Sequence, residues 1–400
     1  MSSIRTLIFT FGISLSLVGP LFAQSLISGE AVGDLTPELE SALNQIRELP
    51  AVTDAQIVTI DASSLGNTNV MFDLAAIGGP VYAMVAEPRT AAFAEASLDR
   101  GDAFSWTADV SGDAFAMTII EVDSNKRVYG SVLGSNRTYE IRPIAETAHV
   151  LIEYDTSSFP PEHPEELPTD PEQPFEDGSI SPDLPDELPP IRILIAFTTL
   201  AAQPYPNPEI QARLIVSSAN RVYEESRIPT RLELAGFELV DYTEGASMYA
   251  DLDALRLKSD GEMDDLHSLR DKYEADLVHL IVSRTDFCGL AYVNAGKETA
   301  FGVTAAQCAV ANLSFAHEIG HNLGACHDPL NSSNCTPYSP DGYGFQHPLG
   351  LYRDVMAYQC PNGPCARRPV LSHPKEYGES GKHNVRRMTH VRTSIVVGFR

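Results

Sequence analysis

Three histidines near residue 320 carry the clearest chemistry in the sequence. His317 and His321 are four residues apart, and His327 follows six residues later. On a helix, positions i and i+4 lie on one face, so the first two imidazoles can bind one metal ion. Gly324 can adopt the left-handed conformation that ends a helix, and the returning chain would deliver His327 as a third ligand. Three histidines leave one position of a tetrahedral zinc ion open, which is typical of a catalytic site.

Glu318 directly follows the first of these histidines. Beside the metal, it can take a proton from the metal-activated water and pass it to a leaving amine, which is the chemistry of peptide-bond hydrolysis. One alternative is that the spacing is accidental, and another is a degenerate, inactive copy of the motif. Chance is disfavoured because residue frequencies give on the order of one accidental match in 10⁴ to 10⁵ chains of this length.

The extended motif resembles the metzincin metalloproteases, in which a methionine lies below the zinc in a tight turn. Met356 lies 29 residues after His327 and fits this role. Tyr358 follows it by two residues, and astacins and serralysins carry a tyrosine at this spacing that is an extra (fifth) zinc ligand and steadies the oxyanion. Asp328 instead resembles the adamalysin or reprolysin branch, which lacks that tyrosine. A buried structural role for Tyr358 therefore stays open.

The resemblance is closest to the bacterial peptidyl-Asp metalloendopeptidase family, within the reprolysin-like metzincins. It covers most of residues 191–400 and, less strongly, residues 106–154. Beyond the zinc motif it rests on residues 288–293, 356–360 and 365–374. The resemblance implies an endopeptidase that uses one catalytic zinc ion and cuts protein or peptide substrates on the amino side of aspartate or glutamate. His373 stands where the family usually has asparagine, so that wall of the site differs.

Basic residues near the C-terminus supply a candidate pocket for an acidic substrate. Residues 366–400 contain eight Lys or Arg against two Glu, a balance of +6 in a chain of net charge −26. In metzincins the segment after the methionine turn walls the pocket for the residue that follows the cut. Arg367 or Arg368 could there pair with a substrate carboxylate. The alternative is a solvated basic tail that balances the acidic residues 157–190.

The residues around the zinc motif predict an α/β (α+β) fold with a mostly parallel sheet. Residues 191–197 form a near-continuous apolar run, typical of a strand buried on both faces. A helical pattern follows Pro208, and strands near 232–240 and 277–282 flank a helix near 262–274. This alternation predicts a metzincin-type catalytic domain at 191–400 with right-handed crossovers. Residues 299–305 are expected to form an exposed edge strand to which substrate backbone adds.

Upstream residues predict a small β-rich domain at 24–156. Between residues 106 and 154, short β-branched and aromatic runs alternate with turn signals, which predicts an antiparallel meander. A helix is expected at 36–47. Residues 157–190 are rich in proline and acid and contain no Lys or Arg, which indicates a semi-rigid, exposed linker that proteases can cut.

The N-terminal residues and the cysteines both point to export. Residues 1–23 contain Arg5, an apolar stretch and small residues for cleavage, which predicts a signal peptide; a membrane anchor is the alternative, but the stretch is shorter than the roughly 20 residues of a span. All six cysteines lie in the last third: Cys288, Cys308, Cys326, Cys335, Cys360 and Cys365. In an exported chain this suggests three disulfides. Fifteen pairings are possible, and we expect neighbours to pair.

Charge and organisation complete the expectation. The net charge of −26 repels nucleic-acid phosphates. We therefore expect a secreted or periplasmic monomer that binds no nucleic acid and has no stable membrane span. A separate N-terminal domain and a cuttable linker suggest a zymogen whose pro-domain is an intramolecular inhibitor. No cysteine precedes Cys288, which excludes a thiol switch and leaves occlusion or an aspartate ligand such as Asp113.

Two competing functions remain at this point. One is a metzincin endopeptidase of broad or apolar specificity, and the other is a non-catalytic secreted zinc-binding module. The intact Glu318 favours an enzyme, because a pure binder has no need of a general base.

Overall fold

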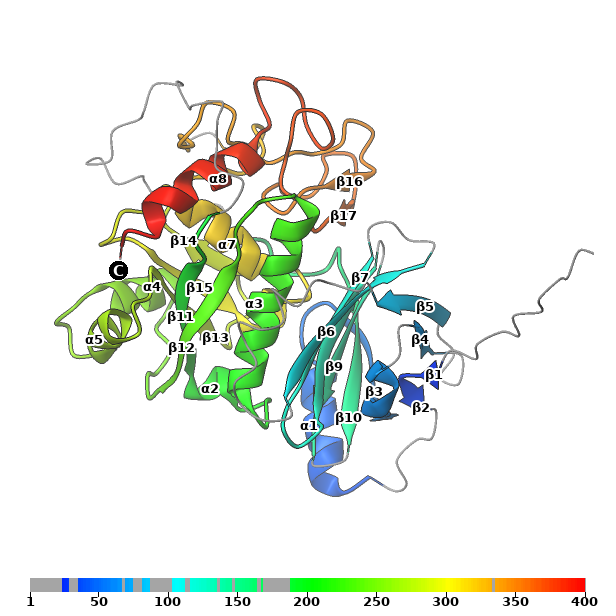
Figure 1. Cartoon of the computed structure of the whole chain (residues 1–400). Helices are drawn as coiled ribbons and strands as arrows, with labels where there is room; N and C mark the ends of the chain where they lie inside the picture. Colours follow the sequence, from blue (N-terminus) through cyan, green and yellow to red (C-terminus); the bar gives the residue numbers. More distant parts are fainter. Residues whose placement is uncertain are drawn as a thin grey trace, which may run out of the picture.

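The computed structural model describes residues 24–28, 35–66, 69–74, 81–86, 103–111, 116–134, 137–145, 148–163, 167, 188–332 and 335–399. These residues have a mixed α/β architecture with two large sheets, and helix α3 (Pro208–Glu225) lies between the two sheets (Figure 1). The expected signal peptide, Asp113 and most of residues 157–190 lie outside the described residues. The helices in the described part of the chain are all too short or too polar to cross a membrane.

The five-stranded sheet holds the strands nearest the histidine motif. Its order is β12-β11-β13-β15-β14. The strands are β11 (Ile191–Thr198), β12 (Leu232–Val240), β13 (Leu277–Val282), β14 (Gly289–Ala291) and β15 (Phe301–Ala305). The first four in this order pair in parallel, whereas β14 pairs antiparallel to β15.

The expectation of an exposed edge strand at residues 299–305 is wrong. β15 lies between β13 and β14, and all its residues are buried. The edge is the short β14. The error has a physical reason, because an apolar run of β-forming residues looks the same whether its strand has one hydrogen-bonded neighbour or two.

Helices cover both faces of this sheet. Alternate β11 residues point to opposite faces, so Ile193 and Ile195 pack with α3 and the later helices, whereas Leu194 and Ala196 pack on the other side. The helices are α2 (Thr199–Ala202), α3, α4 (Met248–Arg256), α5 (Asp265–Lys272), α6 (Ala306–Ala309), α7 (Ser314–Asn322) and α8 (Val385–Val396). α3 begins at the predicted proline, and α5 falls within the helix expected near 262–274.

The N-terminal sheet has the order β1-β4-β5-β6-β7-β8-β9-β10-β3-β2 among the described residues. Its strands are β1 (Gln24–Ser25), β2 (Ile27–Ser28), β3 (Val52–Ile60), β4 (Asn69–Asp73), β5 (Val81–Ala86), β6 (Phe104–Val110), β7 (Met117–Val122), β8 (Val128–Leu133), β9 (Arg137–Pro143) and β10 (His149–Asp155), with a 3₁₀ turn at Ala62–Gly66. From β6 to β10, consecutive strands pair antiparallel. Helix α1 (Pro37–Arg47) begins at the capping side chain of Thr36.

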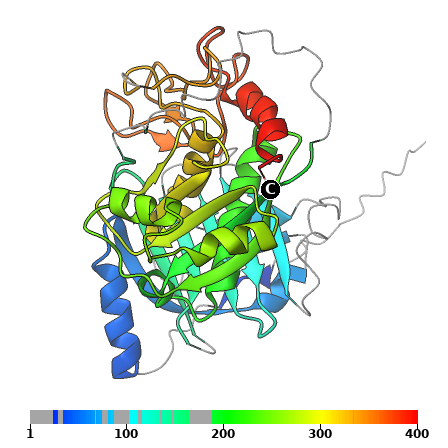
Figure 2. The same ribbon diagram turned by 90° about the vertical axis from the view of Figure 1, so that its left-hand side faces the viewer.

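The N-terminal sheet packs against α3. Met117, Ile119 and Tyr129 belong to the same apolar cluster as the buried residues of α3. At the edge of this contact, the Ser217 hydroxyl donates to Glu121 at 2.6 Å. In the turned view, the cyan strands lie behind the five-stranded sheet (Figure 2). The contact therefore joins the two sheets through one helix.

Candidate active site

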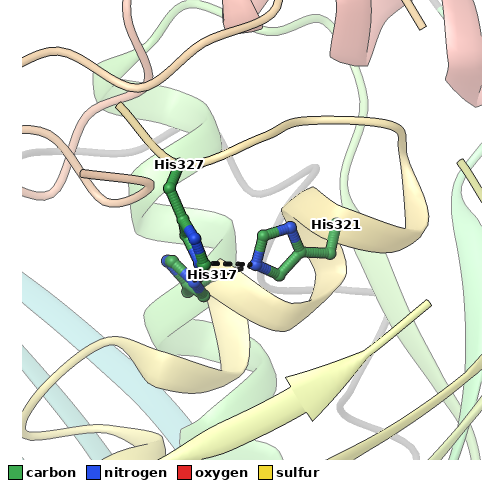
Figure 3. Close-up of side chains that lie close together, drawn as sticks. All are labelled: His317, His321 and His327. Carbon is green, nitrogen blue, oxygen red and sulfur yellow. Dashed lines mark hydrogen bonds between the residues drawn. The ribbon is translucent and has the colours of Figure 1, made fainter. Parts of the chain in front are cut away.

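Helix α7 brings two of the three histidines together. His317 and His321 lie on one face of this buried helix. Gly324, at φ +92°, ends the helical turn as predicted, and its N–H donates to the His321 carbonyl at 2.7 Å. The chain then turns back and brings His327 to the other two (Figure 3). The three Nε2 atoms lie 3.0–3.1 Å from one another.

The hydrogen bonds of the outer ring nitrogens fit a metal site. The Nδ1 atoms of His317 and His321 each lie 2.8 Å from a backbone carbonyl, of Val355 and Ala325 respectively. With Nδ1 as the donor, Nε2 carries a lone pair, and such lone pairs cannot hydrogen-bond to one another. Burial lowers the pKa of His321 to about 4 and those of His317 and His327 well below the usual value, so the imidazoles are neutral. Three converging neutral nitrogens suit Zn²⁺.

Glu318 lies beside this cluster. Its side chain is buried, and neither carboxylate oxygen has a hydrogen-bond partner among the described residues. Burial raises the pKa of Glu318 well above its usual value, and the nearby Glu162 carboxylate raises it further. Gly289 of the edge strand contacts the Glu318 carboxylate so closely that any Cβ at that position would collide with it. A side chain there would therefore displace Glu318.

Met356 is fully buried below α7. Its sulfur packs against Gly320, where a Cβ would clash with it. The backbone N–H groups of Met356 and Ala357 both donate to Asp354 Oδ1, at 3.1 and 2.9 Å, which fixes the tight turn. Sequence reasoning missed Asp354, although an aspartate that accepts from the backbone two residues on is a recognised turn signal.

Tyr358 lies against the third histidine. Its ring centroid is 4.3 Å from that of His327. Its hydroxyl donates to two backbone carbonyls of the linker, at 2.8 Å to His163 and at 3.2 Å to Glu162. Its backbone N–H donates to Asp328 at 3.1 Å. The hydroxyl is therefore near the histidine cluster and in contact with the linker.

The two arginines of the predicted pocket have different surroundings. Arg367 has a buried side chain, and its Nε and Nη2 atoms donate to the Val355 carbonyl at 3.0 and 2.6 Å. His317 uses the same carbonyl, and Arg367 Nη2 lies 2.9 Å from His317 Nδ1, so Arg367 directly contacts the histidine cluster. Arg368 instead stacks over the Tyr352 ring, 3.4 Å from its centroid. The two lie at the end of a small parallel pair, β16 (Tyr352–Arg353) and β17 (Ala366–Arg367).

Arg367 forms part of a pocket that holds a carboxylate. Its Nη1 atom lies 2.6 Å from Glu162 Oε1. The same oxygen accepts from the Ser314 hydroxyl at 2.7 Å and from the Asn312 side-chain amide at 3.2 Å. We call Arg367, Asn312 and Ser314 the carboxylate pocket. Sequence reasoning missed Glu162, Asn312 and Ser314, because no sequence spacing links residues so far from Arg367.

Three disulfides hold the segments that carry these residues. They join neighbouring cysteines, as expected: Cys288–Cys308, Cys326–Cys335 and Cys360–Cys365. The first joins the residue before β14 to α6. In the second, Cys326 directly precedes His327. The third closes a short loop between Tyr358 and Arg367. Each bridge thus fixes a segment next to the site.

Comparison with known proteins agrees with this geometry. The chain matches the reprolysin-like metallopeptidases of family M12B over residues 210–328, from α3 to just past the third histidine. A peptidyl-Asp metalloendopeptidase from Xanthomonas campestris pv. campestris is 30% identical, over 85% of this chain and 82% of that protein. Another, from Stenotrophomonas maltophilia strain R551-3, is 31% identical, over 89% of this chain and 86% of that protein.

These similarities define first a class and then a family. The class is the zinc metalloendopeptidases with a reprolysin-like domain. Within it, this chain belongs to the peptidyl-Asp metalloendopeptidase family. Membership favours an enzyme over the non-catalytic zinc-binding module considered above. Among solved structures, metalloproteinase-II from Bacteroides fragilis aligns with a TM-score of 0.39 at 12% identity, over 79% of this chain and 92% of that one.

Proposed function

We propose that this metalloendopeptidase cuts peptide bonds on the amino side of Asp or Glu. In this proposal His317, His321 and His327 hold one zinc ion, Glu318 is the general base, and Arg367 recognises the acidic side chain after the cut bond. The observation that carries it is a buried guanidinium next to the histidine cluster, 2.6 Å from a carboxylate oxygen. Broad or apolar specificity is the alternative, and nothing in the pocket favours it.

The histidine cluster and Glu318 supply the hydrolytic chemistry. When bound, zinc acts as a Lewis acid that makes a water molecule more acidic and polarises the substrate carbonyl. Glu318 would take the proton of the attacking water and deliver it to the leaving nitrogen. Two features support this role. Its carboxylate has no competing partner among the described residues, and its raised pKa suits a group that must hold a proton briefly. Met356 supports the helix from below.

The carboxylate pocket supports the acidic specificity. A charged donor in a buried site binds a carboxylate far more strongly than it binds a neutral amide of the same shape. The Ser314 hydroxyl and the Asn312 amide add two neutral donors to the same oxygen. A substrate with Asn in place of Asp would leave the Arg367 charge buried and unpaired, which is costly.

We propose two roles for Tyr358. Its ring packs against His327, which is a structural role. Its hydroxyl lies where it can donate to a carbonyl oxygen, since it already donates to the carbonyls of Glu162 and His163. We propose that the same donor steadies the developing oxyanion of a bound substrate.

We also propose that the chain is made as an exported zymogen. Its parts would be a signal peptide at 1–23, a pro-domain at 24–156, a linker at 157–190 and the catalytic domain at 191–400. Three disulfides support an oxidising compartment outside the cytosol. The linker contains ten Asp or Glu and no Lys or Arg, so an enzyme of this specificity would find many cut sites in its own linker. The close contact of the N-terminal sheet with α3 supports a pro-domain that is docked on the catalytic domain.

The test uses two matched fluorogenic peptides that differ only in Asp or Asn after the scissile bond. The processed wild-type protein should hydrolyse the Asp peptide, and Glu318→Ala and a zinc chelator should each abolish this activity. Equal hydrolysis of both peptides would keep the zinc chemistry and overturn the acidic specificity. Hydrolysis that survives Glu318→Ala would overturn the role of the base.

A further inference from the structure

The beginning of the linker lies along the open edge of the five-stranded sheet. The Cys288 N–H donates to the Pro161 carbonyl at 2.9 Å, and the His163 N–H donates to the Gly289 carbonyl at 3.2 Å. Further on, Leu167 forms a parallel bridge with Tyr292. These contacts follow β14 in one direction. The linker thus forms backbone hydrogen bonds along the edge at which an extended peptide would dock.

Side chains anchor this segment beside the catalytic residues. The His163 ring packs against Tyr249 and Phe287, with both centroids 4.5 Å away. The small cavity beside Glu318 and His321 is lined on its other side by Glu162 and His163. The segment therefore walls off the space next to the general base that a scissile bond would need.

Glu162 is the residue of this segment that enters the carboxylate pocket. Its side chain is 4% exposed, and Oε1 accepts from three donors. Arg367 is held from behind by the Val355 carbonyl, and its Nη1 also donates to the Asn312 carbonyl at 2.7 Å. With the guanidinium fixed in this way, the pocket can take one carboxylate at a time. Glu162 and a substrate acid must exclude each other.

We propose that Glu162 is a built-in competitor of the substrate carboxylate, and that it keeps the uncut chain latent by filling the carboxylate pocket. The inference rests on the proposed function in one respect, namely that the carboxylate pocket binds the acidic side chain of the substrate. Latency and specificity then depend on the same arginine. Because the segment is joined to the site by the chain itself, its effective concentration is in the millimolar range or above, and it excludes substrate without tight intrinsic binding.

The test measures binding in the full-length chain, so that cutting of the linker plays no part. Glu318→Gln provides an inactive background, and a short dye-labelled peptide containing Asp reports binding by fluorescence anisotropy. Adding Glu162→Gln should tighten binding of the Asp peptide at least tenfold and leave an Asn peptide much less affected. Glu153→Gln is the matched control and should change nothing. Glu153 lies nine residues before Glu162 and forms a partly exposed ion pair with Arg137, so the substitution removes the same charge.

The outcomes distinguish a failure of the inference from a failure of the proposed function. Unchanged binding of the Asp peptide on Glu162→Gln overturns the inference, and the proposed function survives if the processed wild-type enzyme still prefers Asp over Asn. An equal gain for both peptides also overturns it, because Glu162 would then block the cleft without competing for an acid pocket. Loss of the preference in the processed enzyme overturns the proposed function instead.

A second measurement covers the case in which the variant does not fold. A synthetic peptide of residues 157–167 should inhibit the processed wild-type enzyme in competition with substrate, and the same peptide with Glu162→Gln should inhibit at least tenfold less. Equal inhibition by both peptides would contradict the role of Glu162.

Discussion

Helix α7 and the start of the linker each place a buried glutamate in the same cleft, with opposite surroundings. Glu318 on α7 has no hydrogen-bond partner for either oxygen among the described residues. Glu162 in the linker has three donors on one oxygen. The difference indicates that the two carboxylates have different roles. A carboxylate without partners can exchange a proton, whereas a carboxylate surrounded by donors is held in place.

The largest effect is expected from Glu318→Gln. Removing the general base should lower kcat by roughly 10² to 10⁴, while bound zinc stays at one ion per chain, since the three imidazoles are untouched. Peptide hydrolysis and metal analysis of the processed protein measure both quantities. Glu298→Gln is the matched control, because Glu298 is exposed and pairs only with the exposed Lys258 among the ion pairs described. A loss smaller than tenfold would contradict the account.

Arg367→Gln should affect the acidic pocket more than the chemistry. Losing a buried partner of a carboxylate costs about 2–5 kcal/mol, so kcat/KM for the Asp peptide should fall by roughly 30-fold to several thousandfold. The Asn peptide should change little. Arg368→Gln is the natural control, because Arg368 stacks on Tyr352. If both peptides lose activity equally, the arginine supports the zinc site through Val355 and His317 and does not recognise the substrate.

Docking of the N-terminal sheet should weaken as the pH rises. Burial raises the pKa of Glu121 to about 7 from 4.5, against hydrogen bonds from Ser217 and Ser105. A raised carboxyl pKa means that the full stability is present below pH 4.5 and is lost as the pH rises through 7. The shift corresponds to at most roughly 3 kcal/mol.

The measurement for this effect uses the single tryptophan. Trp106 lies on β6, opposite Ile120, so its fluorescence reports on the N-terminal sheet. The urea midpoint of the wild type should fall more between pH 5 and pH 8 than that of Glu121→Gln. Parallel curves for the two proteins would show that Glu121 does not titrate in this range.

The smallest effect is expected from removing the Cys360–Cys365 bridge with serine at both positions. The bridge spans five residues, and closing so short a loop contributes roughly 2 kcal/mol. Because the loop lies between Tyr358 and Arg367, selectivity for Asp over Asn should drop a few-fold, while zinc content should not change. A loss of zinc with unchanged selectivity would contradict this prediction.

The same two regions show what the sequence could predict. The histidine cluster was predictable because its ligands lie within eleven residues, on one helix and the turn after it, and helix geometry fixes their relation. The carboxylate pocket was only half predictable. A basic segment after Met356 pointed to Arg367, but Glu162 lies 205 residues away, and only the folded chain brings them together. The prediction of an edge strand at residues 299–305 was wrong for a similar reason, because tertiary structure decides which strands lie beside it.

The most direct test of the central claim is a digest of a denatured protein mixture by the processed enzyme, with mass spectrometry of the new N-termini. The account predicts that Asp, and then Glu, is the residue directly after most cut bonds, and that Arg367→Gln removes this bias. New N-termini that begin mainly with apolar residues in the wild-type digest would contradict it.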